Sequence, residues 1–245
     1  MSEVRKTVRR HIKSYVYQPF CWGKASLLVI LGFLLGILIP FLGILIAITM
    51  YFPTLPDPGD LEDYKPPLVS EVYSANGLKL GQFAGQRRIW ASLDQVSPTL
   101  INALLSAEDS DFYQHWGVSV SGIMRAAIKN LKAGRVVEGA STITQQLSRS
   151  LFLSTEVKYS RKIKEALTSI LIEQQYSKSE ILELYINQNF MGKGCYGMQA
   201  AAKFYFNKNV DSLAIEESAF LVGLLQAPSS YSRDPERAER RRNVV

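Results

Sequence analysis

The chain combines one continuous apolar run with a long region of helical periodicity. From Ala25 to Phe52 no residue is charged, and a helix of that length can cross a hydrocarbon core of about 30 Å with some tilt. From residue 97 onward, apolar side chains recur every three or four positions, which is the period of an amphipathic helix. The pattern predicts helices over residues 97–108, 120–133, 142–152, 160–176, 177–187, 198–206 and 213–226.

Residues that start and stop helices support these boundaries. Ser97 and Pro98 form an N-cap followed by a proline at the first helical position. Gly134 is suited to end the second helix, and Ser177 with Glu180 matches a capping box. On the helix over 160–176 we expect the buried apolar stripe to be Ile163, Leu167, Ile170 and Leu171.

The remaining segments predict a stiff connector and a small β element. Proline is dense over residues 53–67, which favours an extended chain. Residues 69–83 alternate like two short strands around Asn76-Gly77, a pair that suits a two-residue type I′ turn. The fold class is therefore mainly α, with a small β-hairpin and one preceding transmembrane helix. The expected parts are a basic tail (1–24), a membrane anchor (25–52), a connector (53–67) and a folded domain (68–245).

The distribution of charge predicts the orientation of the anchor. Residues 1–24 contain six Lys or Arg and one acid, which accounts for five of the six net positive charges of the chain. A positive flank stays cytoplasmic, so the folded domain should be exported. The rest of the chain is nearly neutral, so the high pI does not indicate nucleic-acid binding. A cleaved signal peptide is the alternative, but its apolar core is usually only ~7–15 residues long.

The two cysteines would lie in different compartments under this topology. Cys21 is at the cytoplasmic edge of the anchor, and Cys195 is in the exported part. They cannot then pair with each other, so we expect the fold to hold without an intrachain disulfide.

An acidic cluster is predicted at the end of the first helix of the domain. Residues 108–117 bring together Glu108, Asp109, Asp111 and His115. Acidic side chains at a helix C-terminus face the unfavourable end of the helix dipole, so local stability would not select them. A solvated turn is the ordinary alternative for such a cluster, and a single histidine is more often a structural hydrogen-bonding group than a catalyst.

A run of neutral hydrogen-bonding side chains follows in residues 139–146. A glycine loop and a Ser/Thr helix cap explain Gly139 and Ser141. They do not explain Thr144, Gln145 and Gln146 in succession. Neutral donors of this kind are suited to sugar hydroxyls, amides and phosphate oxygens.

A cationic cluster is predicted on the helix over 160–176. Arg161, Lys164 and Glu165 can share one helical face, and Arg149 and Lys158 lie upstream. A solvated face with an Arg161–Glu165 pair is the ordinary alternative. The functional interpretation is a cradle for a diphosphate, since Arg and Lys are its natural ligands.

Five segments, in this order and spacing, resemble the glycosyltransferase module (glycosyltransferase family 51) of class A penicillin-binding proteins and their monofunctional relatives. The resemblance covers about residues 68–245 and implies a lysozyme-like helical domain. The matching motifs are E-D-x-x-F-x-x-H-x-G at 108–117, G-x-S-T-I-T-Q-Q at 139–146, R-K-x-x-E at 161–165, K-x-x-I-L-x-x-Y-x-N at 178–187 and R-R-x-x-V from residue 241.

The resemblance implies an activity and a set of functional residues. The family polymerises lipid II into β-1,4-linked glycan strands, with inversion at the donor and release of undecaprenyl diphosphate, on the outer face of the bacterial cytoplasmic membrane. Glu108 would be the general base, and Glu165 would be a second essential carboxylate whose role stays open. The implied substrate-binding residues are Asp109, His115, Ser141, Thr142, Gln145, Gln146, Arg149, Lys158, Arg161, Lys162, Asn187 and Gln226.

The resemblance also bears on cofactors and partners. It implies no cofactor and leaves stimulation by a divalent cation open, although no dedicated ligand set is visible. The implied partners are lipid II, the growing lipid-linked glycan, membrane lipids and other cell-wall synthesis proteins, with no nucleic acid. We also expect an apolar face near the bilayer, with Phe83, Trp90 and residues 112–116 as candidates.

Some positions depart from the family pattern. Ala140, Ser150, Val157 and Gln226 stand where members often have Gly, Asn, Arg and Lys, which leaves the phosphate-contacting set uncertain but not the reaction. Val245 follows the fifth motif directly, and no S-x-x-K serine in a suitable context is visible. We therefore expect either a monofunctional enzyme or, preferably, the N-terminal part of a bifunctional one.

Two other functions remain open. A peptidoglycan-cleaving, lysozyme-like enzyme would share helices and a catalytic glutamate, but it would not need the cationic cluster or the anchor. A non-catalytic scaffold of the cell-wall machinery would not need both Glu108 and Glu165, and both are present.

Overall fold

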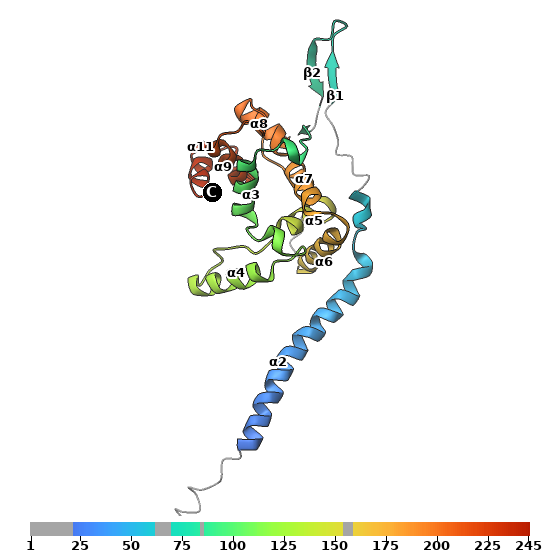
Figure 1. The fold of residues 1–245 in the computed structure, drawn as a ribbon, viewed down its shortest axis with the longest axis vertical. Helices are drawn as coiled ribbons and strands as arrows, with labels where there is room; N and C mark the ends of the chain where they lie inside the picture. Colours follow the sequence, from blue (N-terminus) through green and yellow to red (C-terminus); the bar gives the residue numbers. More distant parts are fainter. Residues whose placement is uncertain (1–21, 62–69, 84–85, 154–158) are drawn as a thin grey trace, which may run out of the picture. The chain divides into compact units, whose positions relative to one another are not determined.

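The computed structural model describes residues 22–61, 70–83, 86–153 and 159–245 (Figure 1). The chain divides into two units, Met1–Met50 and Tyr51–Val245. The helix α2 (Trp22–Tyr51) begins in the first unit. The segment Ser26–Thr54 is long and apolar enough to cross a membrane. The helix expected over residues 25–52 is thus present, and its apolar side chains are exposed along most of its length.

The proline-rich connector is not extended in its described part. Residues Phe52–Thr54 and Pro58–Leu61 form two short 3₁₀ helices, because the fixed φ of proline fits the first turn of a helix. The Tyr176 hydroxyl donates to the Pro58 carbonyl oxygen at 3.0 Å, and Leu61 is buried in the core. The prediction of an extended connector is therefore wrong up to Leu61; the rest of it lies outside the described residues.

The predicted hairpin is present, but its turn differs. Strands β1 (Ser70–Tyr73) and β2 (Lys79–Phe83) pair antiparallel. Ser74 donates its N–H to the Leu78 carbonyl oxygen, which leaves a three-residue loop. Only Gly77 in this loop has a positive φ, at 80°. A type I′ turn needs positive φ at both central residues, so the two-residue turn predicted at Asn76-Gly77 is wrong.

The second unit is otherwise helical. The seven predicted helices are all present, with ends that differ by at most about two residues. Ser97, Thr142 and Ser177 accept a backbone N–H as helix caps. The helices are α3 (Pro98–Glu108), α4 (Val120–Ala133), α5 (Ile143–Phe152), α6 (Tyr159–Gln175), α7 (Lys178–Gln188), α8 (Met198–Phe206), α9 (Ile215–Leu224), α10 (Pro228–Tyr231) and α11 (Pro235–Arg242).

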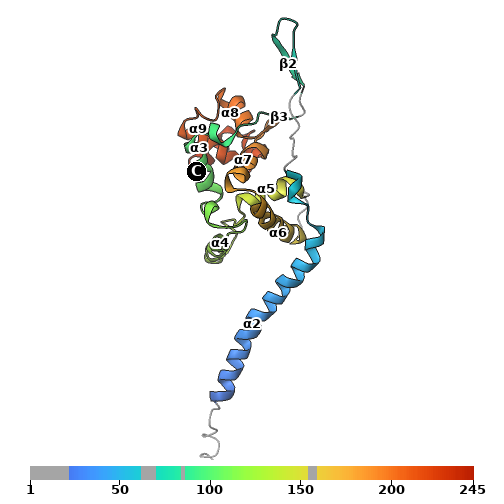
Figure 2. The same cartoon turned by 45° about the vertical axis from the view of Figure 1, so that its right-hand side comes forward.

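The helices pack in two groups. α3, α9 and α11 pack together, and α5 packs against both α6 and α7. Figure 2 shows α7 between these groups and α4 at the opposite end of the domain from α8. One contiguous core joins the groups, and its largest fully buried side chains include Leu100, Leu104, Phe112, Leu147, Ile172 and Tyr185.

The face that α6 buries is not the predicted one. The buried residues are Glu165, Thr168, Ser169 and Ile172, whereas Ile163, Leu167, Ile170 and Leu171 are only half-buried. The apolar stripe predicted there is therefore wrong, because α6 presents a mostly polar face to the residues that surround the site.

A glycine permits the close contact between this face and the loop before α4. Gly117 has φ of 93°, and a Cβ atom there would lie 2.6 Å from the Ser169 carbonyl carbon. Thr142 and Ser169 both donate their hydroxyls to the Gly117 carbonyl oxygen, at 2.6 and 3.2 Å. Three segments therefore meet at one residue that only glycine fits.

Two short strands were not predicted from the sequence pattern, and neither were α10 and α11. Strands β3 (Arg87–Arg88) and β4 (Cys195–Tyr196) form a two-residue parallel pair, which is too short to have a period. Cys195 in β4 is buried and free. Cys21 lies outside the described residues, so the expectation that the two cysteines do not pair stays a prediction.

Candidate active site

Glu108 is the last residue of α3 and is held by the second motif. Gln146 of α5 donates its side-chain N–H to Glu108 Oε2 at 2.9 Å. The amide oxygen of the same glutamine accepts the Tyr185 hydroxyl, also at 2.9 Å. A phenol that donates to the amide oxygen fixes the N–H₂ group toward the carboxylate. The first, second and fourth motifs therefore meet at one carboxylate.

Tyr185 is a buried donor in this chain of hydrogen bonds. Its side chain is fully buried on α7. Burial raises the pKa of the Tyr185 hydroxyl well above its usual value, and the negative charge of Glu108 raises it further. The hydroxyl therefore keeps its proton, as the contact with Gln146 requires.

Asp109, the next residue, also lines the cleft, but its side chain is buried. Its Oδ2 atom accepts the backbone N–H of Ile143 in the first turn of α5 at 3.0 Å. The same atom lies 3.0 Å from His115 Nε2, while His115 Nδ1 accepts the N–H of Gly117. Because Nδ1 is an acceptor, Nε2 carries the proton and donates to Asp109. The pair fixes α5 to the first motif.

Three further residues predicted to bind substrate are also turned inward. Thr142 and Gln145 form a capping box at the start of α5, and both are buried. Asn187 bonds to both the N–H and the carbonyl oxygen of Ala91. Substrate would have to break these bonds to reach them, and the same holds for Asp109 and His115. These bonds give the five residues a positioning role, and their contact with substrate stays a prediction.

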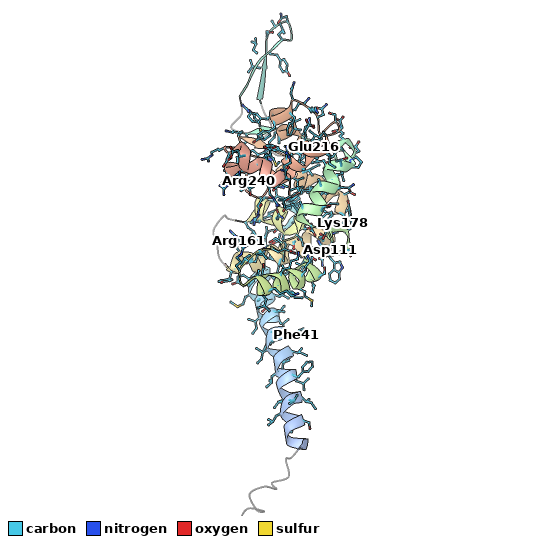
Figure 3. All side chains as sticks on the ribbon, turned by 90° about the vertical axis from the view of Figure 1, so that its left-hand side faces the viewer. Phe41, Asp111, Arg161, Lys178, Glu216 and Arg240 are labelled. Carbon is cyan, nitrogen blue, oxygen red and sulfur yellow. The ribbon has the colours of Figure 1, made fainter. Side chains whose placement is uncertain are left out.

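Glu165 lies in a different environment from Glu108. Its side chain is 1% exposed and lies between Arg161 Nε at 3.1 Å and Lys162 Nζ at 2.8 Å. Lys162 also donates to the Ser141 hydroxyl at 2.8 Å. The cationic cluster is therefore anchored to the segment that begins the second motif. Figure 3 shows Arg161, Asp111 and Lys178 at about the same level of the domain.

Glu173 is a second acid with a buried side chain, and it supports the first turn of α5. Glu173 Oε1 accepts the Thr144 hydroxyl at 2.6 Å and Lys178 Nζ at 2.7 Å. The Lys178 ammonium also lies 4.4 Å from the ring centroid of Phe112. This contact explains Lys178 and Thr144 in the motifs as parts of the support, since a buried acid needs a paired cation.

A cleft of about 440 Å³ opens beside Glu108. The far wall includes three charged residues that the sequence analysis missed, Arg125, Lys129 and Glu138. Glu138 accepts Arg125 Nε at 2.8 Å and also contacts Lys129. These bonds, the Lys129 bond first, lower the pKa of the Glu138 carboxyl below its usual value. An i, i+4 pair of cations on α4 is the signal that could have revealed this wall.

Three predicted residues are not joined to this arrangement in the described part of the chain. Arg149 is exposed in the last turn of α5, and its charge lowers the pKa of Tyr185, so it lies near the site. Gln226 is exposed after α9, with the Tyr231 hydroxyl at 3.4 Å. Lys158 lies outside the described residues.

The fold and the site define a class of protein. A helical domain holds one carboxylate in an open cleft and a second one among cations, an arrangement typical of enzymes that act on glycosidic bonds beside an anionic group. The chain belongs to the transglycosylase family, whose pattern matches residues 76–245. The resemblance found in the motifs is confirmed.

The chain is also similar to penicillin-binding proteins 1A from several bacteria. Penicillin-binding protein 1A of Aquifex aeolicus (strain VF5) is 46% identical over 215 residues, which cover 86% of this chain and 30% of that protein. Penicillin-binding protein 1A of Neisseria flavescens is 46% identical over 204 residues, covering 82% and 26%. The crystal structure of penicillin-binding protein 1A from Haemophilus influenzae is 26% identical, with a TM-score of 0.38, and covers 74% of this chain and 18% of that one. The chain thus spans less than a third of each relative.

Proposed function

We propose that the chain is a peptidoglycan glycosyltransferase that joins lipid II units into β-1,4-linked glycan strands. The observation that carries this proposal is the unlike environment of the two carboxylates. Glu108 lines the open cleft and accepts a hydrogen bond from Gln146. Glu165 is buried against Arg161 and Lys162. One acid is therefore available to a substrate, and the other holds cations in place.

The reaction is an inverting displacement at the donor anomeric carbon. Glu108 accepts the proton of the acceptor 4-hydroxyl, whose oxygen forms the new bond to that carbon. The bond from the carbon to the diphosphate oxygen breaks, and its electron pair leaves with undecaprenyl diphosphate. Arg161 and Lys162 stabilise the negative charge that develops on the leaving group. Holding the two sugars in line is the main task of the site.

Glu165 acts in this proposal by orienting the cations. Its two oxygens lie against Arg161 Nε and Lys162 Nζ, and a nearly fully buried carboxylate has no direct access to a substrate. A buried acid between two basic side chains fixes their direction. The diphosphate then meets preorganised charges and does not have to order flexible ones.

The substrate places the enzyme at a membrane surface. The apolar segment Ser26–Thr54 serves as the anchor, with its basic N-terminal flank in the cytoplasm and the domain on the outer face. α4 supports a second membrane contact, because it exposes an apolar face at helical spacing. That face consists of Val120, Ile123, Met124, Ile128 and Leu131, with Trp116 just before the helix. Phe112, an expected member, is buried in the core instead.

The test is incubation of the purified chain in detergent with labelled lipid II, followed by separation of the products by size. We expect long lipid-linked glycan from the unaltered chain and a loss of at least about 10³-fold in rate with Glu108→Gln, the scale of an essential catalytic group. Glu216→Gln on α9 is the matched control, since it removes one exposed acid that does not line the cleft.

Each other outcome identifies a different function. Shortening of preformed strands without polymer would assign the chain to the lysozyme-like, glycan-cleaving class. Inactivity in both assays, with an intact fold, would favour a scaffold and reject the proposal. Addition and chelation of divalent cations in the same assay would decide whether a metal stimulates the reaction.

A further inference from the structure

The loop after α4 folds back onto that helix through its backbone. Asn130 Oδ1 accepts the N–H groups of Val137 and Glu138, at 2.7 and 3.0 Å. Asn130 Nδ2 donates to the Glu138 carbonyl oxygen at 3.0 Å. Asn130 therefore holds the backbone of residue 138 through three hydrogen bonds that do not involve the Glu138 carboxylate.

The Glu138 carboxylate forms ion pairs with two cationic side chains. Glu138 contacts Arg125 Nε and Lys129 Nζ, and all three side chains line the same cleft as Glu108. Asp111 is a further acid near this pair, with its Oδ2 atom 3.7 Å from Arg125, and Glu108 and Asp109 line the same cleft. An internal anion thus covers the cationic wall of the cleft in the free protein.

The ion pairs of Glu138 with Arg125 and Lys129 are exposed enough for another anion to replace the carboxylate. The side chains of Arg125 and Lys129 are 47% and 56% exposed. Ion pairs open to water contribute little to stability, so opening this one costs little. A phosphate or diphosphate group offers more negative charge and more acceptor oxygens to the same two side chains.

We propose that Arg125 and Lys129 form an anion-binding subsite, that Glu138 occupies it as an internal substitute for phosphate, and that a phosphate-bearing ligand displaces Glu138 on entering the cleft. The identification of that ligand as a lipid-linked diphosphate rests on the proposed function. The subsite itself rests only on the charges and geometry of the cleft.

The cationic cluster around Glu165 provides the internal comparison. There the acid is 1% exposed and pairs with Arg161, whose side chain is 19% exposed, so breaking that pair separates two charges that water screens poorly. One acid is thus a permanent part of its cluster, and Glu138 is a removable part of the other.

The variant Glu138→Gln tests the proposal, because the amide keeps the shape of the side chain and Asn130 keeps the loop in place. Removal of one negative charge from the cleft should tighten binding of a phosphate group by about three- to tenfold, from the Coulomb energy of charges a few ångströms apart in a hydrated site. Glu236→Gln is the matched control. It also removes one carboxylate that pairs with an arginine, in this case Arg240, on the exposed surface of α11.

Two measurements on the full chain in non-ionic detergent, free of phospholipid, separate the subsite from the proposed function. The first is the affinity for inorganic pyrophosphate by calorimetry, and the second is the KM for lipid II. We expect Glu138→Gln to lower both the Kd and the KM, Glu236→Gln to change neither, and the gain to shrink with added salt. Adding Lys129→Gln to Glu138→Gln should abolish the gain.

The outcomes are distinguishable. Unchanged or weaker pyrophosphate binding by Glu138→Gln would overturn the proposal and show that Glu138 only supports Arg125 and Lys129. Tighter pyrophosphate binding by a chain that makes no polymer would keep the subsite and reject the proposed function. Polymer synthesis with an unchanged Kd and KM in the variant would keep the proposed function and reject the subsite.

Discussion

At the scale of single residues, the site depends on side chains that never need to meet the substrate. Tyr185 donates to Gln146, and Gln146 donates to Glu108. We predict that Tyr185→Phe lowers kcat about fivefold with little change in KM, because a lost hydrogen bond of this kind is equivalent to ~1 kcal/mol and the amide is no longer fixed toward the base. Steady-state kinetics with lipid II measures both constants.

A second tyrosine serves as the control for that substitution. Tyr205 also donates a hydrogen bond from a partly buried hydroxyl, to the Met191 carbonyl oxygen at 3.0 Å, and it does not line the cleft around Glu108. Tyr205→Phe should cost similar stability and leave kcat unchanged. Equal losses of kcat in both variants would show that the Tyr185 effect is only structural.

The residue scale also shows what the sequence could not reveal. The motifs predicted Asp109 and Asn187 as substrate-binding residues, but a motif contains no direction. Asp109 is adjacent to Glu108 in the chain, yet it faces Ile143 and His115. The hydrogen bond that engages the Asp109 carboxylate comes from α5 and joins residues 34 positions apart.

At the scale of elements, α4 is the helix whose exposed surface calls for an explanation. Leu131 is 84% exposed and Ile215 on α9 is 66% exposed, but only Leu131 belongs to an apolar helical face. We predict that a fluorophore on Leu131→Cys is quenched by nitroxide-labelled lipid when the chain is in vesicles, whereas one on Ile215→Cys is not. Such a face inserts at the boundary between head groups and acyl chains.

Thiol labelling can be made selective in this experiment. Cys195 is buried, and burial raises the pKa of its thiol above the usual value, so it reacts poorly. Cys21→Ser removes the other native thiol from both variants. Equal and weak quenching at positions 131 and 215 would mean that α4 does not touch the bilayer.

The periodicity of the sequence predicted where most helices lie, but it predicted less well which residues each helix buries. Caps at Ser97 and Ser177 fixed two boundaries because capping is local, whereas the cap of α5 is Thr142 and not Ser141. The buried face of α6 was mispredicted because Glu165, Thr168 and Ser169 are polar, and burial of polar groups follows from partners on other elements. α11 was missed because its sequence has no apolar stripe. Among its described residues, the buried apolar side chain is that of Ala238, and a single small side chain gives no period.

At the scale of the whole molecule, several acids contribute stability only while ionised. The Ser177 hydroxyl lowers the pKa of Glu180 below its usual 4.5, and Lys208 does the same for Glu217. A lowered pKa in the folded state gives stability that is complete above about pH 5 and is lost as pH falls through the folded value. We predict that the melting temperature is flat from pH 7 to about 5 and declines below it.

The variant Glu180→Gln isolates one part of this effect. It should melt lower than the unaltered chain at pH 7, and the difference should shrink as the pH falls to 3, because protonation of Glu180 removes the charge that distinguishes the two side chains. Melting followed by circular dichroism in detergent measures it. A difference that persists unchanged at pH 3 would assign the loss to helix capping geometry and not to charge.

The cleft beside Glu108 has a consequence for the design of inhibitors. One wall carries the Glu108 carboxylate, and the other carries Arg125 and Lys129 behind Glu138. A compound with two anionic groups would satisfy one wall and be repelled by the other. A zwitterion with a phosphonate at one end and an amine at the other would match both walls, and its amine would neutralise the base while its phosphonate replaces the internal acid.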